Sequence, residues 1–300
     1  MPTEGCEIFY MDDIRVAAVL MVFVSMAAFL LTFRLLKPRS KGFIDCIAVL
    51  IVSLLIAYGY LVFGQLWIVE WIPLPSVIVL SNWIPPILAA LSAAVWLRLD
   101  SATWRRWPVM MLLMGAAAYA VFYFIPINAP ECRNEWATPR PPIDWPVCLQ
   151  TTPYTCSAAS AATILNTLNI PTSEQEMAEL CLTRSGTTWL GLYHGLSTKL
   201  LGSEYRVEFF ETDVEGLQRM LIEGPVLLCC KLEPMVAKLV PEYVNEGGWI
   251  LGGAHSVVYF GKRHDYHIIG DPSRGFEYWS TLDLNNLWTG IGLRVVRSKG

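Results

Sequence analysis

The sequence predicts a fold in two parts: an α-helical membrane module of about four spans, followed by an α+β domain. The 300 residues are 54% hydrophobic and only 16% charged, which is too apolar for an ordinary soluble protein. Charge is also unevenly spread, since residues 1–130 hold 8 Lys and Arg with 7 Asp and Glu, whereas residues 131–300 hold 14 and 19. We therefore expect a membrane module at 1–127, a linker at 128–146 and a second domain at 147–300.

Four uncharged stretches are long enough to cross a bilayer. A helix rises 1.5 Å per residue, so about 20 apolar residues cover the roughly 30 Å of hydrocarbon. Prolines interrupt the third stretch, and we expect its spanning part nearer Val77–Leu97. Four such stretches so close together favour membrane spans over buried helices of a soluble protein. The stretches are Val16–Phe33, Cys46–Val69, Trp71–Leu97 and Trp107–Pro130.

The basic residues of the short loops predict the orientation of this module. Lys and Arg collect in the cytoplasmic loops of membrane proteins. With four spans, the loops after the first and third spans share one side, so we expect a multi-pass protein of the cell membrane with its second domain on the extracytoplasmic side. One span more or fewer would reverse this result. The basic residues are Arg34, Lys37, Arg39 and Lys41 in the first loop, and Arg98, Arg105 and Arg106 in the third.

The second domain has a mixed pattern that favours an α+β fold. A proline-rich, polar segment, Asn128–Pro146, precedes it and is typical of a linker. Helical patterns come first and strand patterns mostly last, without a regular βαβ alternation. The expected helices are Cys156–Leu168, Glu174–Leu182, Trp189–Leu201, Val214–Glu223 and Glu233–Val240. The expected strands are Arg206–Phe210, Pro225–Lys231, His255–Gly261, Tyr266–Ile269 and Leu293–Arg297.

The composition excludes several kinds of partner. Residues 131–300 carry a net charge of −5 and no basic cluster, which argues against nucleic acid. No GxGxxG or GxxxxGK[ST] motif points to a nucleotide site. The chain has no CxxC, and its histidines lack the paired spacing of zinc ligands. We therefore expect no cofactor and no metal ion.

The stretch "PYTCSAASAATIL" gives Cys156 the features of a nucleophile. Pro153 prevents an earlier helix start, and Thr155 is expected to cap the helix. The free N–H groups and the positive end of the helix dipole would then surround the Cys156 sulfur and favour its reactive thiolate form. A lone cysteine after a turn is more often a small buried hydrophobic residue, so both interpretations stay open for Cys156 taken alone.

Three other residues have the spacing of a catalytic set. Gln150 lies six residues before Cys156 across a short turn, so its amide and the Cys156 N–H are expected to form an oxyanion hole. Of the four histidines, His255 begins a strong strand after a glycine-rich loop. If the next strand, "YHIIGDP", pairs with it as a hairpin, Asp271 returns to the level of His255 and can orient its ring. Spacing therefore favours His255 with Asp271 over the other pairs.

Two further features leave alternatives open. If the second domain lies outside the cytoplasm, a disulfide between Cys132 and Cys148 could hold the linker to the domain; otherwise both are reduced thiols. The loop Asn245–Gly253, just before His255, has four glycines and Trp249. We expect it to be either a mobile rim of the cleft or a simple connection.

Together these segments resemble the C39 peptidases, which are papain-like cysteine proteases best known as the leader-cleaving domains of peptide exporters. The similar segments are "CLQTTPYTCSAASAATILNTLNI", "GTTWLGLYHGLSTKLLG" and "GGAHSVVYFGKRHDYHIIGDPSRGFEYWSTLDLNNLWTG". The resemblance covers about Val147–Val296 and implies a papain-like cysteine peptidase fold. It also implies four roles: Cys156 as nucleophile, His255 as general base and acid, Asp271 as its orienting group and Gln150 as oxyanion donor.

The chain departs from this family in two respects. Ser157 follows the expected nucleophile, where family members usually have glycine. The well-known members carry a six-span transporter and an ATPase after the peptidase, whereas the apolar stretches of this chain come before it.

The sequence thus predicts a membrane-anchored cysteine peptidase, a hydrolase that cleaves peptide bonds through a Cys-His-Asp triad with a glutamine oxyanion donor. Its expected partners are a peptide or protein substrate and the lipid bilayer, and a separate transporter partner stays open. Two alternatives also stay open. The domain could be a non-catalytic, peptide-binding or scaffolding relative, or a related acyl transferase, because the same triad serves several reactions.

Overall fold

A computed structural model describes residues 4–99, 104, 106–123, 129–238, 242–245 and 249–298. Contacts between residues divide the chain into two compact units. The first comprises Met1–Ile68 and Ser76–Ile125, and the second comprises Val69–Pro75 and Pro126–Gly300. The main division lies close to the expected one after residue 127. The short segment Val69–Pro75 differs from the expectation, because it belongs to the second unit.

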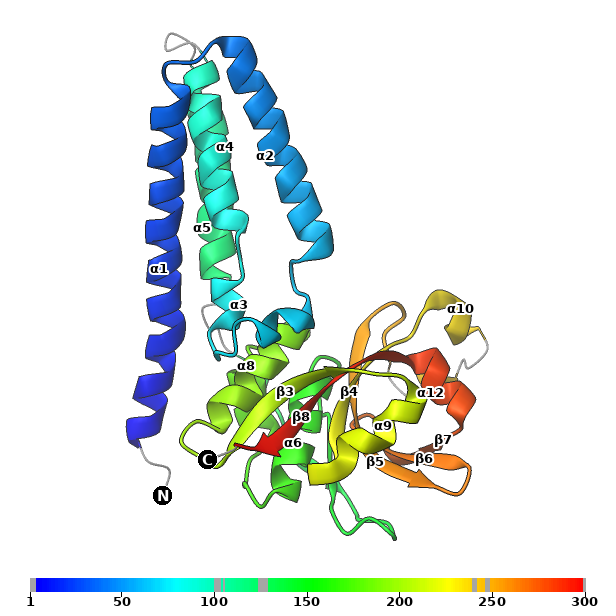
Figure 1. The fold of residues 1–300 in the computed structure, drawn as a ribbon. Coiled ribbons are helices and arrows are strands. Elements are labelled where there is room, and N and C mark those ends of the chain that lie inside the picture. The colour runs from blue at the N-terminus through cyan, green and yellow to red at the C-terminus, as the bar shows by residue number, and fades with distance from the viewer. Residues whose placement is uncertain are drawn as a thin grey trace. The chain divides into compact units, whose positions relative to one another are not determined.

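The first unit is a set of apolar helices (Figure 1). The stretches long and apolar enough to cross a membrane, by length and composition, are Asp13–Leu36, Lys41–Leu61 and Val77–Arg98. Of the fourth expected span, Trp107–Pro130, the structure has a shorter apolar helix, Arg106–Phe122, and residues 124–128 lie outside the described residues. The helices are α1 (Glu4–Leu36), α2 (Lys41–Leu61), α3 (Val77–Leu80), α4 (Ile84–Arg98) and α5 (Arg106–Phe122), with a 3-10 turn η1 (Leu66–Glu70) after α2.

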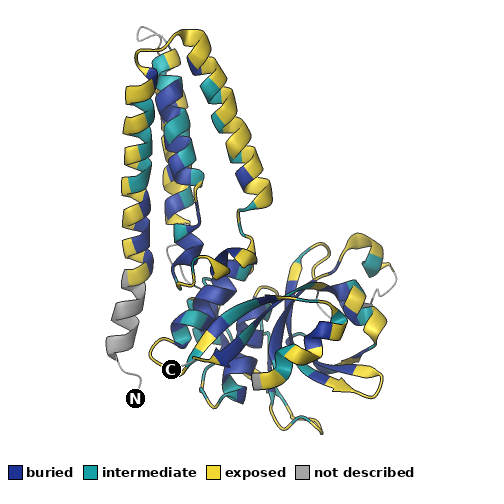
Figure 2. Cartoon of the chain, in the orientation of Figure 1, coloured by how far each residue is buried: buried dark blue, intermediate teal, exposed yellow. Residues whose placement is uncertain are grey.

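Helix α4 is the central helix of the first unit. It packs against α1, α2 and α5. Accordingly, 72% of the apolar window in Val77–Arg98 is buried, against 17% in Asp13–Leu36 and 6% in Lys41–Leu61. The outer faces of α1 and α2 expose large apolar side chains, among them Phe23 and Leu50 (Figure 2). Apolar surface of this extent is rare on soluble proteins and suits contact with lipid.

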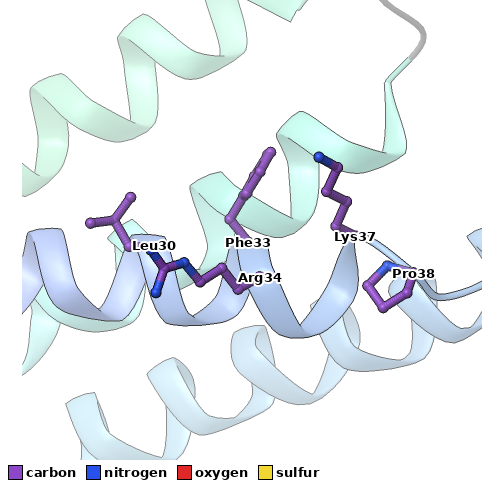
Figure 3. A pocket seen from close by; sticks show the side chains of 5 residues that line it. All are labelled: Leu30, Phe33, Arg34, Lys37 and Pro38. Carbon is purple, nitrogen blue, oxygen red and sulfur yellow. The ribbon is translucent and has the colours of Figure 1, made fainter.

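The described basic residues of the two predicted loops lie at one end of the first unit. Arg98, at the end of α4, forms a 2.6 Å ion pair with Asp45, near the start of α2. The loop between α1 and α2 therefore shares one end with the end of α4; Arg105 lies outside the described residues. A pocket at this end of α1 is lined by Leu30, Phe33, Arg34, Lys37 and Pro38 (Figure 3).

The second unit is built on a six-stranded antiparallel sheet with the strand order β3-β8-β4-β5-β6-β7 (Figure 1). Strands β5 and β6 form the predicted hairpin, in which Val258 pairs with Gly270. This register returns Asp271 to the beginning of β5. The strands are β3 (Tyr205–Glu211), β4 (Val226–Lys231), β5 (Ala254–Arg263), β6 (Tyr266–Asp271), β7 (Gly275–Trp279) and β8 (Trp288–Arg297).

Helices pack on this sheet and build the core. Helix α6 (Cys156–Thr167) packs against β4 and β5, and also contacts α7 (Glu174–Leu180) and α8 (Trp189–Lys199). A second apolar cluster joins alternate residues of the central strands to α9 (Val214–Met220) and α12 (Thr281–Leu287). Its members include Leu217, Val226, Leu228, Val257, Tyr259, Ile269, Trp279, Leu284 and Leu287.

The α+β class predicted from the sequence is correct, and each expected strand is present; β4 begins one residue later than expected, and the other four strands have wider bounds. The expected helix Glu233–Val240 is the shorter α10 (Pro234–Ala237), and residues 239–240 lie outside the described residues; a further short helix is α11 (Glu242–Asn245). The expected helix Val214–Glu223 is α9 followed by a 3-10 turn, η2 (Leu221–Glu223).

The sequence prediction missed β7, α12 and a two-stranded sheet of β1 (Glu135–Ala137) with β2 (Val147–Leu149). Strand β1 lies within the expected linker. Its three residues sit among prolines, and its pairing with β2 crosses the loop between them, so the local pattern gave no strand signal.

Candidate active site

Cys156 is the first residue of α6 and is half exposed. Every alanine of this helix is fully buried, because α6 packs against β4 and β5. The small-residue helix is therefore buried, and Cys156 lies partly exposed at its tip. Thr155, expected to cap the helix with its hydroxyl, instead donates that hydroxyl to the Glu174 carboxylate at 2.6 Å.

The β5–β6 hairpin brings His255 and Asp271 into contact. The His255 Nε2–H donates to Asp271 Oδ1 at 3.0 Å, and both side chains are buried. This bond leaves Nδ1 as the other ring nitrogen of His255, and the mutual effect of His255 and Cys156 on their pKa values places the thiol beside the imidazole. Cys156, His255 and Asp271, the three residues selected from their spacing, therefore lie close together in the structure.

The Asp271 carboxylate accepts three more hydrogen bonds. Its Oδ1 accepts from the Ser273 backbone N–H at 2.7 Å and the Ser273 hydroxyl at 2.6 Å, and its Oδ2 accepts from the Trp249 indole N–H at 2.8 Å. Burial opposes ionisation of this carboxyl group. The charge of His255 and the hydrogen bonds from His255 and Ser273 outweigh burial and hold the pKa of Asp271 below its ordinary value. Asp271 is therefore a fixed anion behind the imidazole.

Trp249 is a site residue that sequence reasoning did not identify. Its ring lies over the His255 imidazole, with the centroids 4.1 Å apart, and only 3% of the residue is exposed. It also packs edge-on against Tyr243. The loop was expected to be a mobile rim or a simple connection; residues 246–248 lie outside the described residues, but Trp249 itself forms a wall of the site. An aromatic residue in a glycine-rich loop was the available signal.

The charges of the site favour a thiolate facing an imidazolium. Burial opposes ionisation of Cys156, but the charge of His255 and its hydrogen bond lower the pKa of the thiol below its ordinary value. Burial likewise opposes the charged form of His255, but the charges of Asp271 and then Cys156 raise its pKa to about 10. Opposite shifts of this kind are typical of reactive thiols.

The buried cysteines near this site behave differently. Burial raises the pKa of Cys132 to about 12, with the Glu174 charge as the next cause. Cys132 and Cys148 are free thiols, so the structure has the reduced form of the two alternatives. Burial is also the main cause that raises the pKa of Cys148, Cys181, Cys229 and Cys230. Cys156 is thus the thiol of the described second unit that the structure activates.

Gln150 is hydrogen-bonded both to the residue after Asp271 and to the loop before Cys156. Its backbone N–H donates to the Pro272 carbonyl at 2.7 Å, next to Asp271 in the chain, and its side-chain Nε2 donates to the Thr152 carbonyl at 3.2 Å. Among the described residues, its buried Oε1 has no hydrogen-bond partner. Buried polar atoms are rarely left unpaired, so this amide marks a place where a bound molecule or water would add a contact.

The other three histidines have surroundings different from that of His255. His194 is fully buried in α8, with Nδ1 2.6 Å from the Pro75 carbonyl oxygen. His267 lies between the Tyr259 and Thr281 hydroxyls, at 3.1 and 3.2 Å. His264 is exposed at the β5–β6 turn, where its φ is +54°. Within the described chain, His255 is the histidine that lowers the pKa of Cys156.

Ser157, which replaces the usual glycine of the resembled family, has a partner across the site. Its hydroxyl lies 2.8 Å from the Ser256 hydroxyl, and both residues are buried. The residue after the cysteine is therefore bonded to the residue after the histidine. Ser160, one turn later, donates to the Ser256 carbonyl at 2.9 Å and reinforces the link between α6 and β5.

Removal of one hydroxyl of this pair should cost more stability than removal of both. Ser157→Ala leaves the buried Ser256 hydroxyl without its partner, which costs about 1–3 kcal/mol, whereas the double change Ser157→Ala with Ser256→Ala removes that penalty. Chemical denaturation of the detergent-solubilised full chain measures both. A double variant whose loss equals the sum of the single losses would contradict the pairing.

The rate of Cys156 alkylation should reach half its maximum at a pH below that of an ordinary thiol. Because the raised pKa of His255 keeps the imidazole charged in this range, His255→Ala should move the midpoint to higher pH. Iodoacetamide labelling read by mass spectrometry measures the midpoint. His264→Ala, at the exposed turn, is the control and should leave it unchanged; an unchanged midpoint in His255→Ala would refute the ion pair.

Comparison with known proteins finds partial similarity to solved peptidase domains. No protein-family model and no curated protein matches the chain. The peptidase domain of Streptococcus ComA, a bi-functional ABC transporter of a quorum-sensing pathway, is 20% identical over 50% of this chain and 96% of that domain, with a TM-score of 0.39. A double glycine motif protease from an AMS/PCAT transporter, in complex with its leader peptide, is 18% identical over 57% and 97%, with a TM-score of 0.39. The peptidase domain of Streptococcus mutans ComA is 20% identical over 49% and 96%, with a TM-score of 0.34.

Proposed function

We propose that the chain is a membrane-anchored cysteine peptidase that hydrolyses peptide bonds in a peptide or protein substrate. One observation carries the proposal: the half-exposed residue Cys156 lies beside His255, whose Nε2 is hydrogen-bonded to buried Asp271. A nucleophile, a base and an orienting group in this order are what cysteine acyl transfer requires. The papain-like fold that the sequence resemblance implies belongs to the same proposal.

The chain's own groups account for each step of hydrolysis. The Cys156 thiolate attacks the scissile carbonyl carbon, and the C–N bond breaks as His255 gives its proton to the leaving amine. His255 then takes a proton from water, which attacks the thioester and releases the carboxylate product and Cys156. Asp271 remains ionised throughout and holds the imidazolium in its orientation.

Two donors would stabilise the oxyanion that forms during each attack. The first is the backbone N–H of Cys156, at a helix start where the N–H groups lack partners within the helix. The second is the Gln150 amide, which uses one hydrogen for the Thr152 carbonyl and keeps its other hydrogen for a substrate. Each donor of this kind lowers the barrier by about 3 kcal/mol.

A thiol-reactive peptide probe tests the nucleophile. It should label the wild-type chain and Cys132→Ala, because Cys132 has a raised pKa, and should not label Cys156→Ala. His255→Ala and Gln150→Ala should lower kcat/KM on a cleaved peptide by about 100-fold or more. Equal labelling of Cys156→Ala would refute the assignment. A labelled chain that turns over no peptide of a degenerate library would favour the scaffolding alternative, and a product whose mass shows transfer to an amine would favour the acyl transferase.

The proposed location is the extracytoplasmic side of a cell membrane. The support is the shared end of the two basic segments of the first unit and the positive-inside rule, applied to four spans. A reporter fused after Gly300 should therefore be active only outside the cytoplasm. A cytoplasmic signal would overturn this side and would point to a leader peptide cut in the cytoplasm, as in the exporters of the resembled family.

A further inference from the structure

Glu174 is a fully buried carboxylate that the proposed mechanism does not use. It is the first residue of α7 and is 0% exposed. Its Oε1 accepts from the Thr151 backbone N–H at 2.7 Å and from the Thr155 hydroxyl at 2.6 Å, and its Oε2 accepts from the Thr151 hydroxyl at 2.7 Å. A buried charge is costly unless it is well hydrogen-bonded, and here three donors from one short loop meet it.

The loop that Glu174 holds runs between two residues of the candidate site. Residues 151–155 connect Gln150, the expected oxyanion donor, to Cys156. Thr151 is the first residue of this loop and Thr155 is the last. The Glu174 carboxylate therefore accepts hydrogen bonds from both ends of the loop. Thr151 also accepts a hydrogen bond from the Arg133 backbone N–H at 2.9 Å, which ties the same point to the segment before β1.

The contact at Thr155 bears directly on the reacting atoms. The peptide bond between Thr155 and Cys156 carries the N–H that would serve the oxyanion. The orientation of this peptide is set from two sides, since the Thr155 carbonyl accepts from the Ala159 N–H at 2.9 Å and its hydroxyl is bonded to Glu174. Thr155 is fully buried, so no solvent replaces this contact.

The carboxylate is suited to this task because it accepts hydrogen bonds and donates none. An amide in its place would present N–H groups to one of the threonine donors. A methyl group would leave the two Thr151 donors without this acceptor and the Thr155 hydroxyl with only the Thr152 carbonyl, at 3.2 Å, and the Thr152 hydroxyl, at 3.0 Å, as acceptors. The negative charge is also felt nearby, since it helps to raise the pKa of Cys132 and of Cys148.

We propose that Glu174 is a positioning residue, which holds the Gln150–Cys156 loop so that the oxyanion donors and the nucleophile keep their mutual geometry. This inference rests on the proposed peptidase function. A displacement of about 1 Å in such a constellation lowers turnover by up to about 100-fold, so the loss of Glu174 should appear in kcat more than in KM.

The first test compares Glu174→Ala with Glu176→Gln in the full chain. Glu176 lies two residues along the same helix, and its bonds go to Thr172 and Lys199. Glu174→Ala should lower kcat by about 10- to 100-fold with KM changed less than threefold, and Glu176→Gln should leave both within twofold. An unchanged kcat in folded Glu174→Ala, or an equal loss in Glu176→Gln, would overturn the proposal.

A second pair of variants keeps the test decisive if Glu174→Ala fails to fold. Thr155→Val removes the hydroxyl and keeps the shape of the side chain, whereas Thr155→Ser keeps the hydroxyl. Thr155→Val should lose kcat as Glu174→Ala does, and Thr155→Ser should recover most of it. Equal turnover of the two Thr155 variants would overturn the role of this hydrogen bond.

Labelling of Cys156 by iodoacetamide separates this inference from the proposed function, because it needs no peptide turnover. If the wild-type chain labels at Cys156 but cleaves no peptide, the peptidase proposal fails. The positioning role of Glu174 is then judged on labelling alone. A labelling rate in Thr155→Val at least threefold below that of Thr155→Ser would support it, and equal rates would overturn it.

Discussion

A carboxylate buried as completely as Asp271 needs several hydrogen-bond donors, because one partner does not offset the free-energy cost of removing its charge from water. Its two oxygens are satisfied by His255, Ser273 and Trp249. The same anion raises the pKa of the imidazole, and the charged imidazole lowers the pKa of Cys156. The reactivity of the thiol thus depends on a carboxylate that does not touch it. The sheet must hold this carboxylate in register, and the β5–β6 pairing does so.

The other requirement is that α6 approaches the sheet closely enough for Cys156 to meet His255. Small side chains make this approach possible, since every alanine of α6 is buried against the strands. The hydroxyls of Ser157 and Ser160 then fasten the helix to Ser256, the neighbour of His255. A serine after the nucleophile is therefore compatible with the site, because its hydroxyl is paired instead of being buried alone.

Much of this arrangement was predictable from the sequence, and the rest was not for physical reasons. Cys156, His255 and Asp271 follow from local signals: a helix start, a strand start and a hairpin return. Glu174 gives no such signal, and the glycine-rich loop around Trp249 does not reveal its partner. The roles of these two residues arise from contacts with residues 19 to 23 positions away in the chain. Thr155 is a residue type that often caps helices, but its hydroxyl donates to the buried Glu174 carboxylate and not to the helix. Strand β1 was hidden among prolines, because its pairing with β2 is not local.

The two buried carboxylates, Asp271 and Glu174, have different roles in the proposed site. Asp271 acts through His255 on the charge of the nucleophile, while Glu174 acts through Thr151 and Thr155 on the loop that leads to it. Their separation in the fold has a physical reason. A carboxylate placed directly beside Cys156 would oppose ionisation of the thiol, as Glu174 does for Cys132 and Cys148. The neutral hydroxyls of Thr151 and Thr155 connect Glu174 to the loop before α6, so its negative charge does not have to lie beside the Cys156 sulfur. The site therefore combines a fixed geometry with a thiol whose pKa is lowered.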